Sequence, residues 1–119
     1  MSLLSANQLP VWAETGDFIE MQKDGIDGVD GLDGARFVTV SADGSHVYAA
    51  GTLEHTVAVF SRNASTGVLG FIEAQKDGIN GVDGLTGPRS LSISPDGSHL
   101  YAGGFDSHTI AVLSRNGST

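Results

Sequence analysis

Four aspartates spaced three residues apart are the most obvious candidates for metal chemistry in this chain: Asp24, Asp27, Asp30 and Asp33. A calcium ion needs several oxygen ligands that converge on one point, and carboxylates supply them. Calcium loops place ligands at every second position, however, whereas these aspartates alternate with glycines in steps of three. We therefore interpret the stretch as a structural loop whose glycines allow tight turns. A calcium site is the alternative, and no other cofactor is expected.

Two arginines, Arg36 and Arg89, each stand shortly after a glycine-rich stretch of this kind. A guanidinium group binds carboxylates and phosphates through two parallel hydrogen bonds. Each arginine could pair with the aspartate of its own stretch, Asp30 or Asp83, or the two could hold an anionic ligand together. The sequence favours the pairing over the ligand.

The four histidines are His46, His55, His99 and His108. Histidine is the usual general base and a frequent zinc ligand. These four form two equivalent pairs, whereas an active site gathers dissimilar groups at one point. We therefore expect them to stabilise turns. The sequence also contains no Gly-x-Ser-x-Gly, P-loop or His-Glu-x-x-His motif.

These equivalences arise because the chain repeats itself. Residues 14–66 and 67–119 align without a gap at an offset of 53, and 32 of the 53 paired positions are identical. A period of this length indicates a supersecondary unit that buries its faces against neighbouring units. The expected organisation is a leader (1–13), a first repeat (14–66) and a second repeat (67–119).

The amino-acid composition disfavours some partners and excludes some kinds of site. The net charge is −8 among 119 residues, which disfavours nucleic acid and anionic membranes as partners. The chain has no cysteine, so disulfides and thiolate metal sites are excluded. It shows neither a run of 18 apolar residues nor a signal-peptide pattern. The compartment stays open, with a secreted or cell-surface location expected if the chain was excised from a longer bacterial protein.

Each repeat contains four short runs of strand character. They span residues 18–22, 37–41, 47–50 and 56–60 in the first repeat, and 71–75, 90–94, 100–103 and 109–113 in the second. Asp-Gly turns separate the second and third runs, and a long glycine-rich link separates the first from the second. Four antiparallel strands with one long link per repeat are typical of a β-propeller blade.

The segments DGSHVYAAG (43–51) and HTVAVFSRNAST (55–66), with their second copies, resemble the lactonase-type or YVTN-type propeller repeats. The resemblance covers both repeats. It implies an all-β fold of four-stranded antiparallel blades, two repeats per chain, completed to a closed ring by oligomerisation. It says less about activity, because such propellers include lactone hydrolases, oxidoreductase partners and noncatalytic scaffolds.

The resemblance also implies an order of strands. The strand before the Asp-Gly turn is innermost and the Phe-Ile-Glu strand is outermost, so residues 37–76 form one complete blade. The second blade lacks its outer strand, and residues 18–23 of another copy are the expected cover for its edge at Thr109–Ser114. A head-to-tail ring of three or four chains follows. The residues expected to pair between copies are Phe18, Ile19, Met21, Thr109, Ile110 and Val112.

The leading functional prediction is a noncatalytic propeller module that serves as a scaffold or binding surface for an unidentified small molecule or protein. One alternative is a lactone hydrolase, and another is a calcium-dependent adhesion module. A hydrolase needs charged groups that differ between blades. The main differences of this kind are Glu54 opposite Ser107 and Leu53 opposite Asp106.

Overall fold

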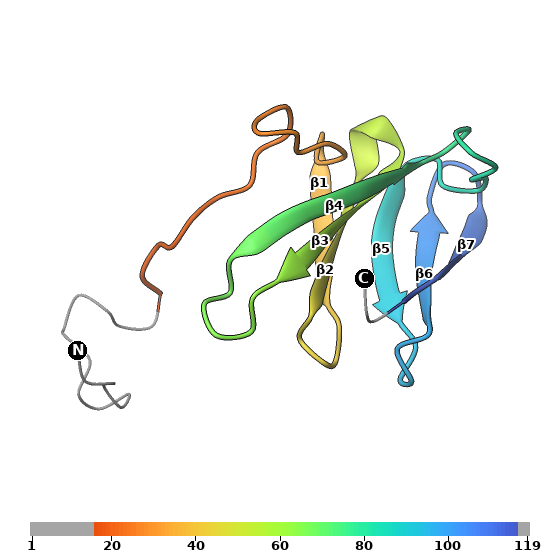
Figure 1. The fold of residues 1–119 in the computed structure, drawn as a ribbon. Helices are drawn as coiled ribbons and strands as arrows, with labels where there is room; N and C mark the ends of the chain where they lie inside the picture. The colour runs from red at the N-terminus through yellow and green to blue at the C-terminus, as the bar shows by residue number, and fades with distance from the viewer. Residues whose placement is uncertain (1–15, 117–119) are drawn as a thin grey trace, which may run out of the picture.

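The computed structural model describes residues 16–116, which form seven strands and one short 3-10 helix (Figure 1). The strands are β1 (Ala35–Val40), β2 (His46–Gly51), β3 (Thr56–Arg62), β4 (Leu69–Lys76), β5 (Pro88–Ile93), β6 (His99–Gly104) and β7 (Thr109–Ser114), and helix η3 spans Thr52–Glu54. All neighbouring strands are antiparallel, in a four-stranded sheet of order β1-β2-β3-β4 and a three-stranded sheet of order β5-β6-β7. The prediction of one complete and one three-stranded blade is confirmed. We call the two sheets blade 1 and blade 2.

The turns between the first two strands of each blade follow from their Asp-Gly pairs. Gly44 and Gly97 both have a φ of 75°, a left-handed conformation that glycine adopts without steric cost. The Asp43 carboxylate accepts hydrogen bonds from the Ser41 and Ser45 hydroxyls at 2.6 and 2.7 Å, which closes the turn. Residues 94–98 repeat this arrangement.

The long links run close to the blades that they enter. A Cβ atom at Gly51 would collide with the carbonyl oxygen of Gly31, so the end of β2 must be glycine for the first link to pass. Gly104 and Gly84 repeat this close approach in blade 2. The links are therefore held against the strands rather than hanging free.

The apolar residues of the first link are only partly buried. Val29 packs into the core, and Leu32 is half-buried. Ile26 differs from both, because its side chain is 53% exposed. The N–H of Ile26 donates to Lys23 O and its carbonyl accepts from Val29 N–H, so Ile26 lies at the tip of a turn.

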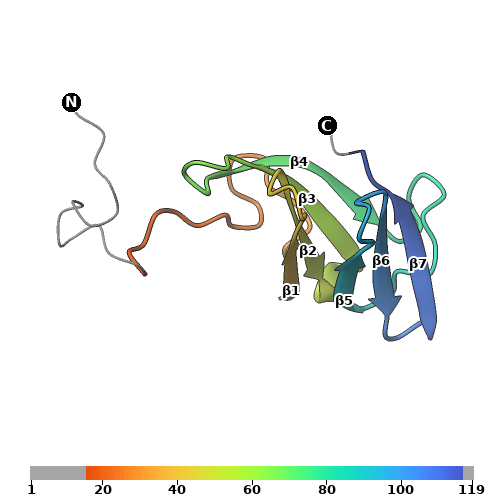
Figure 2. The same cartoon turned by 90° about the horizontal axis from the view of Figure 1, so that it is seen from below.

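Two apolar clusters hold the sheets. One lies between the blades and combines Tyr48, Ala50 and Val57 of blade 1 with Leu85, Leu91, Leu100, Ala102 and Ala111 of the second link and blade 2. The other lies on the opposite face of blade 1, around Val47, Ala49, Ala58 and Phe60. β5 contacts both β1 and β2, so the blades meet along the strands that were expected to be innermost. Residues 16–116 form two adjacent blades and no closed ring (Figure 2).

Residues 18–22 were expected to form a strand, but residues 17–23 pair with no strand in the described part of the single chain. They leave the sheets as an extended segment in both views (Figures 1 and 2). Two hydrogen bonds tie the segment to the start of β4: Gln22 Nε2 to Leu69 O, and Leu69 N to Glu20 Oε2. The proposed strand donation to another copy stays a prediction. No helix in residues 16–116 is long and apolar enough to cross a membrane.

Candidate functional site

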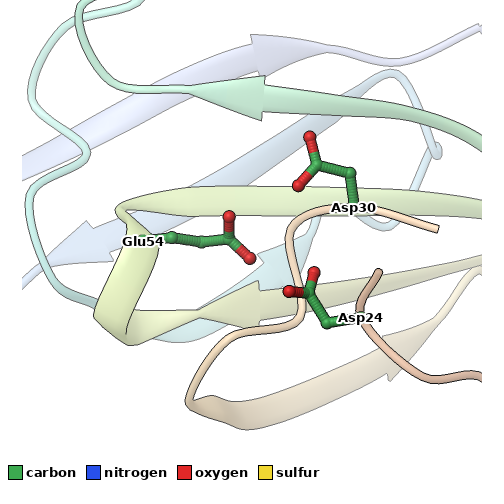
Figure 3. A group of neighbouring side chains, drawn as sticks. All are labelled: Asp24, Asp30 and Glu54. Carbon is green, nitrogen blue, oxygen red and sulfur yellow. The ribbon is translucent and has the colours of Figure 1, made fainter. Parts of the chain in front are cut away.

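Three carboxylates meet at the end of blade 1 where the first link and helix η3 come together. The oxygens of Asp24, Asp30 and Glu54 lie within 4.8 Å of one another, and their side chains point toward a common centre (Figure 3). Asp24 Oδ1 accepts a hydrogen bond from Leu32 N–H at 3.1 Å, and Glu54 Oε1 accepts one from Asp33 N–H at 2.8 Å. The carboxylates thus hold the link in shape.

Lys76 supplies positive charge to this cluster. Its ammonium nitrogen lies 2.9 Å from Asp30 Oδ2 and 3.5 Å from Glu54 Oε2. The hydrogen bond from Lys76 lowers the pKa of Asp30, and the same bond raises the pKa of Lys76. The cluster is therefore an ion-paired group at the end of β4, in which a lysine provides part of the charge that a cation would bring.

The four aspartates of the sequence pattern have different roles in the structure. Asp24 and Asp30 join the cluster, together with Glu54 from the next strand connection. Asp27 occupies a left-handed turn position with a φ of 52°. Asp33 contributes its backbone N–H to Glu54. Spacing alone could not predict Glu54, because it approaches the link only through the fold.

The expected pairing of the two arginines with their own aspartates is wrong. Asp30 pairs with Lys76, whose side chain reaches it from β4. Asp83 Oδ1 accepts from the N–H of Gly84 at 2.8 Å. The Arg89 guanidinium carbon lies 3.9 Å from the centre of the Phe105 ring, a cation–π contact. Arg36 and Arg89 are both exposed, at the beginning of β1 and β5.

The histidines lie in turns and at the contact between blades. His55 and His108 have φ values of 57° and 58°, so both occupy left-handed turn positions. The Gly87 N–H donates to His55 Nδ1 at 2.9 Å, which links blade 1 to the second link and places the proton of the neutral ring on Nε2. The described contacts of His55 fit a structural role.

Arg115 joins the two blades through contacts that sequence reasoning missed. Its Nε donates to the Tyr48 hydroxyl at 2.7 Å, and its second terminal nitrogen lies 3.2 Å from Asp43 Oδ1. Only 5% of the arginine side chain is exposed. Hydrogen bonds from Ser41 and Ser45, together with the Arg115 charge, hold the pKa of Asp43 well below its usual range. Burial raises the pKa of Tyr48. Arg115 lies in a Ser-Arg-Asn segment that occurs in both repeats, and nothing in that segment predicts this contact.

A cavity of about 210 Å³ lies beside Arg115, between the outer parts of the two blades. Blade 1 contributes Val59 and Ile72 to its wall, and blade 2 contributes Leu113. The cavity opens next to the unpaired edge of β7, so its wall is incomplete where a fourth strand of blade 2 would lie.

Two antiparallel sheets that converge along their first strands define a pair of β-propeller blades. The family described as "Lactonase, 7-bladed beta-propeller" matches residues 6–119. The chain therefore belongs to the seven-bladed β-propeller lactonase family. No curated protein matches it.

Solved structures support the same fold. The chain is 28% identical to a protein of Bacteroides fragilis provisionally assigned as a 6-phosphogluconolactonase, with a TM-score of 0.61 over 71% of this chain. A similarly assigned protein of Bacteroides uniformis is 32% identical, with a TM-score of 0.58 over 69% of this chain. The chain covers 22% of each of these proteins. Hydrazine synthase of Kuenenia stuttgartiensis, at 22% identity, a TM-score of 0.53 and coverage of 79% of this chain and 24% of that one, shares the fold alone.

Proposed function

We propose that this chain supplies two neighbouring blades of a propeller that hydrolyses a phosphorylated sugar lactone. The observation that supports the proposal is the family match over residues 6–119, together with the 28% and 32% identity to proteins assigned as 6-phosphogluconolactonases. This support favours hydrolysis over the noncatalytic scaffold that the sequence alone suggested. Hydrolysis adds water to the lactone carbonyl and opens the ring to a hydroxy acid.

Arg36 and Arg89 are the groups that we assign to substrate binding. Both are exposed at the start of the strands along which the blades converge, where a propeller opens onto its central channel. A guanidinium group binds a phosphate through two parallel hydrogen bonds. Two arginines at equivalent positions of adjacent blades can hold the anionic end of one substrate.

Asp106 is the carboxylate that we assign to the activation of water. It is exposed, follows Phe105 (which lies under Arg89), and faces no acidic counterpart because Leu53 occupies the equivalent position. Glu54 is less suited to this role, since Asp33 N–H and Lys76 already engage its oxygens. A general base must take the proton from the attacking water, and a carboxylate without an ion-pair partner among residues 16–116 can do so.

The test is hydrolysis of 6-phosphogluconolactone, followed as acid release above the spontaneous rate. We expect a saturable rate, a raised KM in Arg36→Gln and Arg89→Gln, and a lowered kcat in Asp106→Asn. Asp27→Asn is a matched control, because the second repeat carries Asn80 at that position. A rate equal to the spontaneous one would contradict the proposal.

A further inference from the structure

We propose that residues 17–23 of a second copy of this chain complete blade 2 as its fourth strand, beside β7. The chain contains its own template for this contact. The sequence FIEAQK (71–76) lies in β4 and pairs with β3, TVAVFSR. FIEMQK (18–23) is nearly identical to the first segment, and β7, TIAVLS, is nearly identical to the second. We call the chain that provides residues 17–23 the donor and the chain that provides blade 2 the acceptor.

The template fixes the register of the proposed pair. In blade 1, the partners are Val57 with Gln75, Ala58 with Ala74, and Val59 with Glu73. Subtracting 53 from each β4 residue and adding 53 to each β3 residue gives Ile110 with Gln22, Ala111 with Met21, and Val112 with Glu20. Register matters because a slip of one residue turns every side chain to the opposite face.

The cavity beside Leu113 is the place where a donor side chain would go. In blade 1, the Phe71 ring packs edge-on against Phe60 with centroids 5.6 Å apart. The equivalents of this pair are Phe18 and Leu113, and Leu113 lines the cavity of about 210 Å³. A cavity of about 150 Å³ accommodates a benzene molecule, so this one has room for a phenyl ring. Phe18 is 80% exposed in the single chain and would become buried.

The charged contacts at the internal blade junction have equivalents on the outer flanks, where residues 16–116 place no second blade. Arg115 donates to the carbonyl of Gly97 in its own blade and reaches Tyr48 and Asp43 in the preceding one. Arg62, its equivalent, donates to the carbonyl of Gly44 in the same way. The repeat therefore places Tyr101 and Asp96 of the acceptor within reach of Arg62 of the donor. Likewise, the Lys76–Asp30 ion pair predicts a pair between donor Lys23 and acceptor Asp83.

Apolar side chains on the two outer flanks are also equivalent to a pair that meets between the blades. Val57 and Leu91 are 0% and 4% exposed because they meet between the blades. Their equivalents, Ile110 on the outer flank of blade 2 and Val38 on the outer flank of blade 1, are 72% and 60% exposed. Burying this surface between copies is favourable by the same hydrophobic effect that joins the blades within one chain. The two flanks of one molecule are thus complementary to each other.

A contact between two different flanks is head-to-tail and is satisfied everywhere only in a closed ring. Three copies give 2 × 3 = 6 blades and four give 2 × 4 = 8, so a ring of this kind has an even number of blades and differs in this from the seven of the family. The inference rests on strand pairing and not on lactone chemistry. It therefore stands or falls independently of the proposed function.

Disulfide cross-linking tests the register directly, because the natural chain has no cysteine. Chains carrying only Met21→Cys are mixed with chains carrying only Ala111→Cys and oxidised mildly. We expect a covalent dimer on a non-reducing gel. Glu20→Cys mixed with Ala111→Cys is the matched control, and it should remain uncross-linked because the two side chains lie on opposite faces. Equal yields in both mixtures, or none in either, would overturn the proposal.

Mass measurement of the unmodified chain provides the second readout. Light scattering should give three or four times the protomer mass of 12.3 kDa at micromolar concentration. Arg62→Glu should lower this mass, and adding Asp96→Arg to the same chain should restore it. A 12.3 kDa particle throughout would overturn the assembly. A chain that carries both Met21→Cys and Ala111→Cys is the last check. A disulfide formed only within such a chain would show that the chain covers its own edge, and would overturn the assembly.

Discussion

Blade 1 and blade 2 have closely similar sequences and different surroundings, and the difference shows what neighbours contribute to a blade. Tyr48 is buried and bonded to Arg115, whereas its equivalent, Tyr101, is exposed. Leu85 is fully buried in the second link, whereas Leu32 in the first is only half-buried. The residue types are the same in both pairs. Burial in this fold therefore depends on the adjacent blade as much as on the sequence of the blade itself.

The largest effect on stability is expected for Leu85→Ala, which we compare with Leu32→Ala. Removing a fully buried leucine side chain leaves a cavity, so Leu85→Ala should lower the free energy of unfolding by about 3 kcal/mol. Leu32→Ala should cost roughly 1 kcal/mol in the dilute single chain, because the residue is half-buried. Urea denaturation followed by fluorescence measures both. A larger loss for Leu32→Ala at dilution would contradict the comparison.

The arginine pair gives the second test. Arg115→Met removes hydrogen bonds from a charged donor to Tyr48 and Gly97, and should lower the free energy of unfolding by about 2 kcal/mol. Arg62→Met removes one hydrogen bond, to Gly44, and should cost less than about 1 kcal/mol. The control is Arg115→Lys, which keeps the charge and loses the planar fork. Equal effects of the two Met substitutions in dilute protein would show that the junction is not held by Arg115.

Acid sensitivity is the third probe. The Ser94 hydroxyl, the Ser98 N–H and the Ser98 hydroxyl lower the pKa of Asp96 from 3.8 to about 2. A carboxylate whose pKa is lowered in the folded state stabilises the fold above pH 3.8, and this contribution is lost as the pH falls toward about 2. We expect Tm to fall over that interval, and Asp96→Asn to flatten the fall. Scanning calorimetry at a series of pH values would measure it, and an unchanged slope in Asp96→Asn would contradict the assignment.

The smallest expected effect concerns Lys76 and its equivalent, Lys23. Lys76→Met removes a partly exposed ion pair with Asp30 and should cost about 0.5 kcal/mol, less at high salt. Lys23→Met should leave the stability of the dilute single chain unchanged. In concentrated protein, the two substitutions should have similar effects if Lys23 reaches Asp83 of another copy. Thermal melts at two protein concentrations and two salt concentrations separate these outcomes.

Repetition and turn chemistry were enough to predict the blades. The Asp-Gly pairs at 43–44 and 96–97 and the alternating strands around them predicted antiparallel units, and the family resemblance added the order of strands, which the structure confirms. Contacts between distant segments were not predictable. Asp30 meets Lys76 rather than Arg36, and Arg115 meets Tyr48, because the fold brings together residues 46 and 67 positions apart. Neither pair has a local sequence signal, and both became visible only once the strands were placed.

The anchoring of the first link at Gly31 and Gly51 has a further consequence. Because the link is held against blade 1 by the close approach of two backbones, residues 17–23 leave from a fixed point, tied to the start of β4 by only two side-chain hydrogen bonds. Such an arm could detach from one molecule and attach to another without any melting of the two-blade body. If copies assemble through this arm, exchange between labelled and unlabelled chains should proceed much faster than global unfolding, because only the contacts between copies have to break.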